Sequence, residues 1–133
     1  MAVASGGRLE QHVPDRVGHE SHNPKPGEYA SHHATPVEGT RLAAILGTDP
    51  LQVPTYHHQA VEAETLEGSG WRASAWHADG TLEAMEDAST TFRVAVQWHP
   101  EAGDDQRLFD ALVDAARASR AARAVHGTTP ADR

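Results

Sequence analysis

The stretch Phe92-Arg93-Val94-Ala95-Val96-Gln97-Trp98-His99-Pro100-Glu101 decides the fold class of this chain. Its first seven residues are rich in β-branched and aromatic side chains and predict a buried strand. Open α/β sheets bind ligands at the carboxyl ends of their strands, and His99 lies at such an end. Pro100 disfavours helical backbone at His99, and extended chain places side chains i and i+2 on one side. We therefore expect the Glu101 carboxylate to lie beside the His99 imidazole.

A carboxylate that orients a histidine supplies two members of a nucleophilic triad, so His99 and Glu101 are the candidate catalytic residues. A His-x-Glu sequence also occurs by chance, and it is then more often structural or solvated than catalytic. The third member of the triad is missing. The chain contains no cysteine, which excludes disulfides, thiolate metal sites and a cysteine nucleophile from these residues.

The bulk composition limits the classes of partner. The 133 residues fit one domain and carry a formal net charge of −8. An acidic chain is a poor partner for nucleic acid and for anionic membranes, so neither is expected. No apolar stretch approaches the ~18 residues of a membrane span. Residues 1–7 lack the charged and apolar regions of a signal peptide, and a cytoplasmic location is expected.

Sequence patterns outside the opening stretch predict the remaining elements. Residues 8–36 are polar and proline-rich and predict mainly a loop. Residues 37–47 predict a short helix that Gly47 ends, and residues 51–56 predict a strand in which Pro54 disfavours a central position.

The second half of the chain predicts a hairpin and a long helix. Residues 71–75 alternate as in a strand, Asp79-Gly80 indicates a hairpin turn, and residues 81–86 form the return strand. From Asp104 a helix is predicted, and its apolar face is most simply core. The residues of that face are Leu108, Phe109, Leu112, Val113 and Ala116. Residues 125–133 are expected to form a disordered tail.

Histidine is abundant, with ten residues in the chain. His57 and His58 are adjacent, and in extended chain they point in opposite directions, which predicts one packed and one solvated ring. Five further histidines lie in the polar segment, without helical i, i+4 spacing and without cysteine, so opportunistic metal binding is favoured over a designed site. No metal site and no cofactor are therefore predicted. The five are His12, His19, His22, His32 and His33.

Five segments carry a resemblance to a known family. In chain order they are Gly6 to Asp15, His32 to Val37, Tyr56 to Val61, Asp79 to Glu86 and Val96 to Glu101. Together they resemble the carboxyl half of the gamma-glutamyl-gamma-aminobutyrate hydrolases, which are class I glutamine-amidotransferase-like hydrolases. The resemblance runs from about Ala2 to Phe109. The Gln-Trp-His-Pro-Glu and His-His-Gln-Ala-Val blocks are specific in combination.

The resemblance implies a fold, a site and a reaction. The fold is α/β, a partial flavodoxin-like sheet with a carboxyl-terminal helix, over residues 1–124. His99 would be the general base and Glu101 its orienting carboxylate in a Cys-His-Glu triad. The substrate-binding residues would be Tyr56, His57, His58 and Gln59. The reaction would be hydrolysis of a gamma-glutamyl amide through a thioester, with backbone amides forming the oxyanion hole.

The resemblance also implies that the nucleophile and the oxyanion segment precede Gly6-Gly7, with residues 2–5 as the tail of the nucleophile's helix. We therefore expect an amino-terminally truncated enzyme that is inactive alone and acts on a small gamma-glutamyl amide only when complemented. Its expected partners are an amino-terminal half or further copies of itself, because incomplete sheets expose strand edges. The alternatives are a non-catalytic binding half-domain and a histidine-rich metal-binding protein.

Overall fold

The computed structural model describes residues 1–89 and 92–126. Its elements are, in chain order, η1 (Val3–Ser5), β1 (Leu9–Glu10), α1 (Val13–Val17), β2 (Ala30–Pro36), α2 (Arg41–Leu46), β3 (Leu51–Thr55), β4 (Ala60–Val61), η2 (Ala63–Leu66), β5 (Arg72–Trp76), β6 (Leu82–Glu86), β7 (Val94–Val96), η3 (Pro100–Ala102) and α3 (Arg107–His126), where η marks a 3-10 helix.

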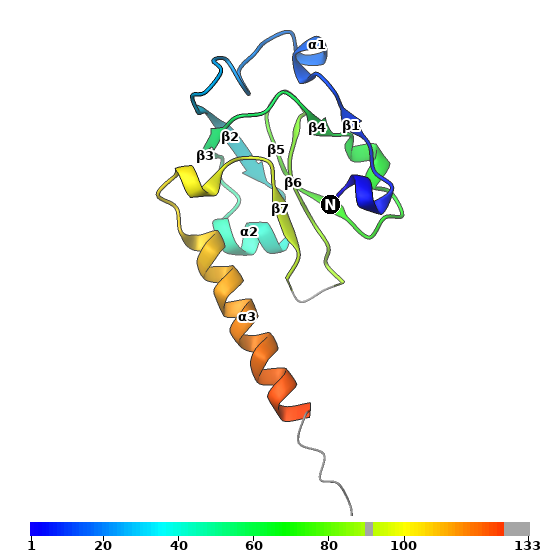
Figure 1. Ribbon diagram of the computed structural model, residues 1–133, viewed down its shortest axis with the longest axis vertical. Helices are drawn as coiled ribbons and strands as arrows, with labels where there is room; N and C mark the ends of the chain where they lie inside the picture. Colours follow the sequence, from blue (N-terminus) through cyan, green and yellow to red (C-terminus); the bar gives the residue numbers. More distant parts are fainter. Residues whose placement is uncertain (90–91, 127–133) are drawn as a thin grey trace, which may run out of the picture.

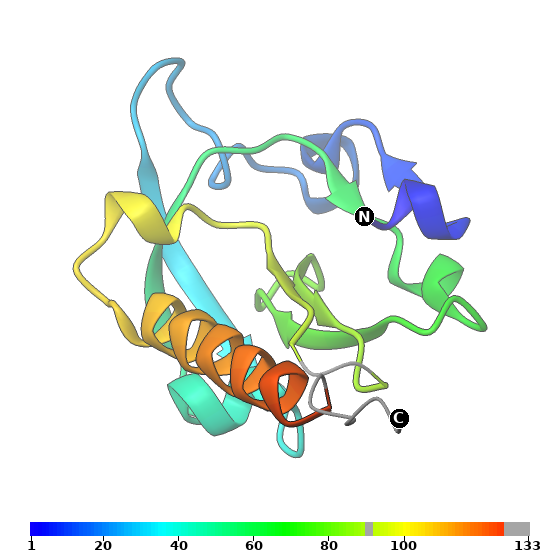
Figure 2. The same cartoon turned by 60° about the horizontal axis from the view of Figure 1, so that its bottom comes forward.

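A curled sheet organises the molecule. Its strand order is β3-β2-β5-β6-β7, and each neighbouring pair is antiparallel. The short strands β1 and β4 pair separately. Helices α2 and α3 lie side by side next to the sheet, and α3 extends beyond it (Figures 1 and 2). The expected α/β architecture with a carboxyl-terminal helix is confirmed.

Local signals in the sequence set the ends of several elements. The Thr40 hydroxyl accepts a hydrogen bond from the Ala43 N–H at 3.0 Å, which caps α2, and Gly47 ends that helix with a φ of 87°. The turn between β5 and β6 is closed by Asp79, whose carboxylate accepts the Thr81 N–H at 2.9 Å. Strand β3 lies at the edge of the sheet, which is the position that Pro54 favours.

Two apolar clusters hold these elements together. One lies beneath α2 and α3, and the other lies beside η1 and η2. The first contains Ala34, Leu42, Leu46, Val53, Ala75, Ala84 and Trp98, and the second contains Ala2, Leu66, Trp71, Leu82 and Met85. Trp98 anchors the chain immediately before His99, because its side chain is buried in the first cluster.

The prediction of a loop over residues 8–36 is wrong for β2, and the short β1 and α1 also lie there. Strand β2 buries His32, Ala34 and Pro36 and exposes the residues between them. This period of two was missed because histidine, alanine and proline are not typical strand formers. Five register pairs with β3 hold the strand in place.

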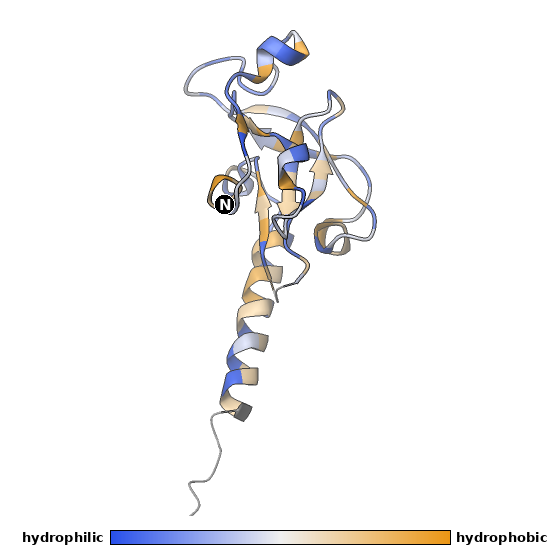
Figure 3. Ribbon diagram, turned by 90° about the vertical axis from the view of Figure 1, so that its right-hand side faces the viewer, coloured by the Kyte–Doolittle hydropathy of each residue, from blue (hydrophilic) through white to orange (hydrophobic). Residues whose placement is uncertain are grey.

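The prediction that the apolar face of the last helix is core is also wrong. Phe109, Leu112 and Val113 are 36%, 51% and 46% exposed. Helix α3 contacts the body through Leu108 and the neighbouring α2, and Figure 3 shows the more apolar part of α3 nearer the sheet. Helical periodicity identified an apolar face but not what covers it. Strand β7 is likewise half-buried rather than buried.

No helix within residues 1–89 and 92–126 is long and apolar enough to cross a membrane. Helix α3 is described as far as His126, and the rest of the expected tail, residues 127–133, lies outside the described residues.

Candidate functional site

His99 and Glu101 are in contact, as their spacing predicts. His99 Nδ1 lies 2.7 Å from Glu101 Oε1. The backbone that joins them is not extended, however, because Glu101 lies in the 3-10 helix η3 that Pro100 begins. The His99 N–H donates to the Pro54 carbonyl at 3.0 Å, which fixes the histidine against the edge strand β3. The hydrogen bond from His99 holds the pKa of Glu101 below its ordinary value, so the carboxylate stays ionised.

This geometry leaves the other nitrogen of His99 available for chemistry. No hydrogen bond to His99 Nε2 is found within residues 1–89 and 92–126. A carboxylate on Nδ1 favours the tautomer whose Nε2 carries a lone pair, and it stabilises the imidazolium that forms after proton uptake. The pair can therefore act as an oriented general base.

Two tyrosines form a hollow beside His99. The Tyr29 ring lies 4.9 Å from the His99 ring and 6.2 Å from the Tyr56 ring. The Gly27 N–H donates to the Tyr56 hydroxyl at 2.9 Å. The hollow measures about 250 Å³ and is lined by Gly27, Glu28, Tyr29 and Tyr56. A larger hollow of about 350 Å³ lies between β4 and β6, away from His99.

The other three residues predicted to bind substrate diverge from Tyr56. His57 turns inward, with its Nε2 3.4 Å from Glu83 Oε1. His58 is exposed, so one ring is packed and the other solvated, as their adjacency predicts. The Gln59 side chain donates to the Gln11 side chain at 2.7 Å. The described structure therefore brings only Tyr56 to the hollow beside His99.

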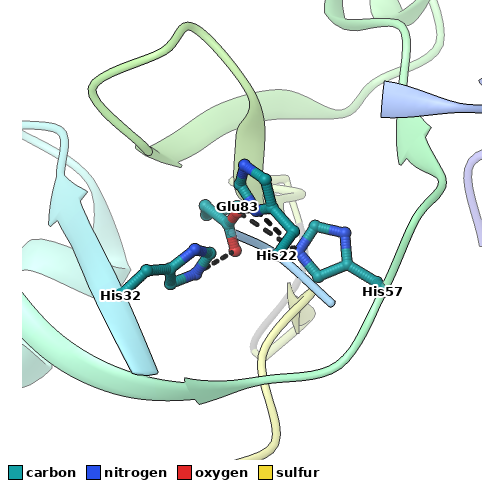
Figure 4. Close-up of side chains that lie close together, drawn as sticks. All are labelled: His22, His32, His57 and Glu83. Carbon is teal, nitrogen blue, oxygen red and sulfur yellow. Dashed lines mark hydrogen bonds and ion pairs between the residues drawn. The ribbon is translucent and has the colours of Figure 1, made fainter. Parts of the chain in front are cut away.

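A second polar cluster lies in the interior and was missed by sequence reasoning. It consists of His22, His32, His57 and Glu83, which come from four separate segments and are all buried (Figure 4). Burial alone would raise the pKa of Glu83, but the three imidazoles around it hold that pKa well below its usual range. No helical spacing links these residues, so only the folded chain shows the cluster. Tyr29 was missed as well, because it lies in the segment expected to be a loop.

The family model described as Peptidase C26 matches residues 1–101. The chain is 48% identical over 117 residues to a candidate glutamine amidotransferase of Mycobacterium tuberculosis, covering 87% of this chain and 37% of that protein. It is 39% identical over 100 residues to a candidate glutamine amidotransferase-like protein of Rickettsia prowazekii, covering 71% of this chain and 34% of that protein. The chain thus spans about a third of the length of these curated relatives.

A solved structure supports the fold. The glutaminase domain of Trypanosoma brucei CTPS with bound acivicin superposes with a TM-score of 0.59 at 23% sequence identity. The match covers 68% of this chain and 40% of that chain. At this identity the likeness establishes the class I glutamine-amidotransferase-like fold, and the arrangement of His99 and Glu101 carries the chemical argument.

Proposed function

Because the chain belongs to the peptidase C26 family of glutamine amidotransferase-like proteins, we propose that His99 and Glu101 are the general base and orienting carboxylate of a gamma-glutamyl amide hydrolase. The observation that carries this proposal is the hydrogen bond of 2.7 Å between His99 Nδ1 and Glu101 Oε1, at the edge of the tyrosine-lined hollow. The cysteine nucleophile lies outside these 133 residues, which contain none.

His99 Nε2 takes the proton of that cysteine thiol, and the thiolate attacks the gamma-carbonyl carbon of the substrate. Backbone N–H groups of the nucleophile's segment stabilise the resulting oxyanion. The imidazolium then gives its proton to the leaving amine, and a thioester remains. His99 next removes a proton from water, which attacks the thioester and releases glutamate. Glu101 remains ionised throughout and holds the imidazole in place.

Tyr29 and Tyr56 are suited to flank the glutamyl group. Tyr29 and Tyr56 are 55% and 37% exposed and both line the hollow, and each offers an apolar face and a hydroxyl. His57 has a different role, because its ring belongs to the buried cluster with Glu83 and His32.

The exposed face of α3 is suited to contact the segment that supplies the cysteine. Phe109, Leu112 and Val113 are exposed and lie in the first half of the helix, which is the part that Figure 3 shows nearer the sheet. Contiguous apolar surface of this kind is typical of an interface, and the relatives are about three times as long as the part matched here.

The hydrolase proposal is tested in a chimera. The matched segment of the Mycobacterium tuberculosis relative is replaced by residues 1–133, and release of amine from gamma-glutamyl amides is measured for the chimera, the parent and the isolated chain. We expect turnover from the chimera within about tenfold of the parent, and none from the isolated chain, because removal of a nucleophile costs about 10⁶-fold. An active parent with an inactive but folded chimera would favour a non-catalytic binding half-domain.

We further expect the isolated chain to self-associate through α3. Substituting Leu112 with glutamate places a charge in the apolar face and shifts the chain toward monomer, because a buried unpaired charge is costly. The measurement is size-exclusion chromatography with light scattering over a tenfold range of protein concentration. Ala118→Glu, an exposed substitution elsewhere on α3, is the matched control. A wild-type chain that stays monomeric at every concentration would contradict this prediction.

A further inference from the structure

Four side chains converge in the interior from separate parts of the chain. His22 lies between α1 and β2, His32 lies on β2, His57 follows β3, and Glu83 lies on β6. Their side chains are 2%, 4%, 9% and 0% exposed, respectively. Figure 4 shows the three rings arranged around the carboxylate. Buried polar groups normally have hydrogen-bond partners, so four metal-ligating side chains gathered away from solvent require an explanation.

Several of the potential ligand atoms are spaced as in a tetrahedral metal site. His22 Nδ1 lies 3.3 Å from His57 Nε2 and 3.3 Å from a Glu83 oxygen. His57 Nε2 lies 3.4 Å from Glu83 Oε1, and His32 Nε2 lies 3.4 Å from the other oxygen, Oε2. One ligand atom from each residue lies within 4.8 Å of the others. Tetrahedral zinc with bonds of about 2.0–2.1 Å separates its ligand atoms by about 3.3–3.4 Å.

Two of the four side chains lack ordinary hydrogen-bond partners. Both carboxylate oxygens of Glu83 and both ring nitrogens of His32 are buried without a hydrogen bond within the described part of the chain. A buried carboxylate whose neighbouring imidazole nitrogens do not form hydrogen bonds with it is costly, and the contact of 3.3 Å between His22 Nδ1 and His57 Nε2 does not relieve it. A cation at the centre of the cluster satisfies the carboxylate and one nitrogen of each imidazole at once.

Outer hydrogen bonds orient two of the rings for this role. His22 Nε2 is held by the Asp79 carboxylate at 2.7 Å, and His57 Nδ1 is held by the Gln59 carbonyl at 2.9 Å. A proton on each of these nitrogens leaves the lone pairs of His22 Nδ1 and His57 Nε2 directed at the cluster. Metal-binding histidines commonly donate their second N–H to a carboxylate or a backbone carbonyl in this way.

We propose that His22, His32, His57 and Glu83 form a closed, four-coordinate site for a divalent transition metal ion, for which Zn²⁺ is the best fit. Three neutral imidazoles and one carboxylate are borderline-soft ligands that suit Zn²⁺ rather than Mg²⁺ or Ca²⁺. All four positions are filled by protein, so the site is structural rather than catalytic. It does not depend on the hydrolase activity proposed above.

Such an ion would fasten the segment between α1 and β2 to the sheet. That segment carries Tyr29 to the His99 ring and Gly27 to the Tyr56 hydroxyl. In the described chain the His22 carbonyl also accepts hydrogen bonds from the His57 backbone N–H and the Thr55 hydroxyl. Binding of the ion would therefore stabilise one wall of the hollow.

The test begins with the unmodified 133-residue chain, stripped of metal with a chelator. Isothermal titration with Zn²⁺ should give one tight site per chain, and Co²⁺ should give the intense visible absorption of tetrahedral coordination. On addition of Zn²⁺, nitrogen NMR should show the largest shifts at His22 Nδ1, His32 Nε2 and His57 Nε2. His33 and His58, which are exposed neighbours of two of the ligands, should show none.

Matched variants locate the site. His32→Ala and Glu83→Gln should weaken Zn²⁺ binding by more than about 100-fold, and Asp79→Asn by about 10–100-fold. His33→Ala and His58→Ala should leave the affinity unchanged. Absence of tight binding by the unmodified chain, a six-coordinate Co²⁺ spectrum, or nitrogen shifts confined to other histidines would overturn the proposal. The measurements on the unmodified chain keep this conclusion independent of whether a variant folds.

Discussion

Replacing His99 with alanine is expected to lower the turnover of the chimera by about 10⁴–10⁶-fold, the loss seen when a triad base is removed. Without the imidazole, no group accepts the thiol proton or protonates the leaving amine. KM should change little, because His99 acts on the reacting atoms and not on the remote part of the substrate. The measurement is steady-state release of amine from a gamma-glutamyl amide at several pH values.

Glu101→Gln should cost less, about 10²–10⁴-fold, because it removes the charge that stabilises the imidazolium but keeps the base. His33→Ala and Glu38→Gln are matched controls, since both side chains are exposed away from the hollow. A turnover of His99→Ala within tenfold of the unsubstituted chimera would contradict the role given to this residue.

Replacing Glu86 with glutamine is expected to lower the free energy of unfolding of the chain by about 3 kcal/mol. The Glu86 side chain is fully buried, and its carboxylate is surrounded by hydrogen-bond donors. Its oxygens receive the N–H groups of Arg41 and Leu42 at 2.9 and 3.0 Å, at the start of α2. The Arg72 guanidinium approaches to 2.6 Å. Glutamine keeps the shape, but it loses the charge and turns a donor toward these groups.

The loss of stability caused by Glu86→Gln should depend on pH. Burial would raise the pKa of Glu86, but the backbone N–H groups of α2 and the Arg72 guanidinium outweigh it and lower that pKa. A carboxylate with a lowered pKa adds stability above its unfolded pKa of about 4.3 and loses it as the pH falls. The difference between the two proteins should therefore be largest near pH 7 and shrink as the pH falls below about 5.

Urea unfolding followed by circular dichroism measures the loss at Glu86, with Glu38→Gln as an exposed control. A difference that stays constant between pH 7 and pH 4, or a loss no larger than that of the control, would contradict the account of this carboxylate.

Local signals made much of the fold predictable. The Thr40 cap marks the start of α2, Gly47 marks its end, and Asp79-Gly80 forms the turn of the β5–β6 hairpin. Each of these features depends on residues that are neighbours in the sequence. The contact between His99 and Glu101 belongs to the same class, since only Pro100 lies between them in the sequence.

Features that depend on distant parts of the chain were not predictable in this way. Alternate residues of β2 are buried, among them His32 and Ala34, and their burial results from the pairing of β2 with β3 and β5. The face of α3 carries a helical period, but the period does not reveal whether anything covers Leu112. The buried cluster joins His22 to Glu83, residues that only the curled sheet brings together.

The central claim is that His99 and Glu101 complete a cysteine hydrolase site, and the covalent intermediate tests it most directly. The chimera is mixed with a gamma-glutamyl amide, quenched with acid within one turnover, and its intact mass is measured. The account predicts a glutamyl thioester on the cysteine-bearing part of the unsubstituted chimera and none in His99→Ala over the same interval. A thioester that forms equally fast in both proteins, or turnover without any thioester, would contradict it.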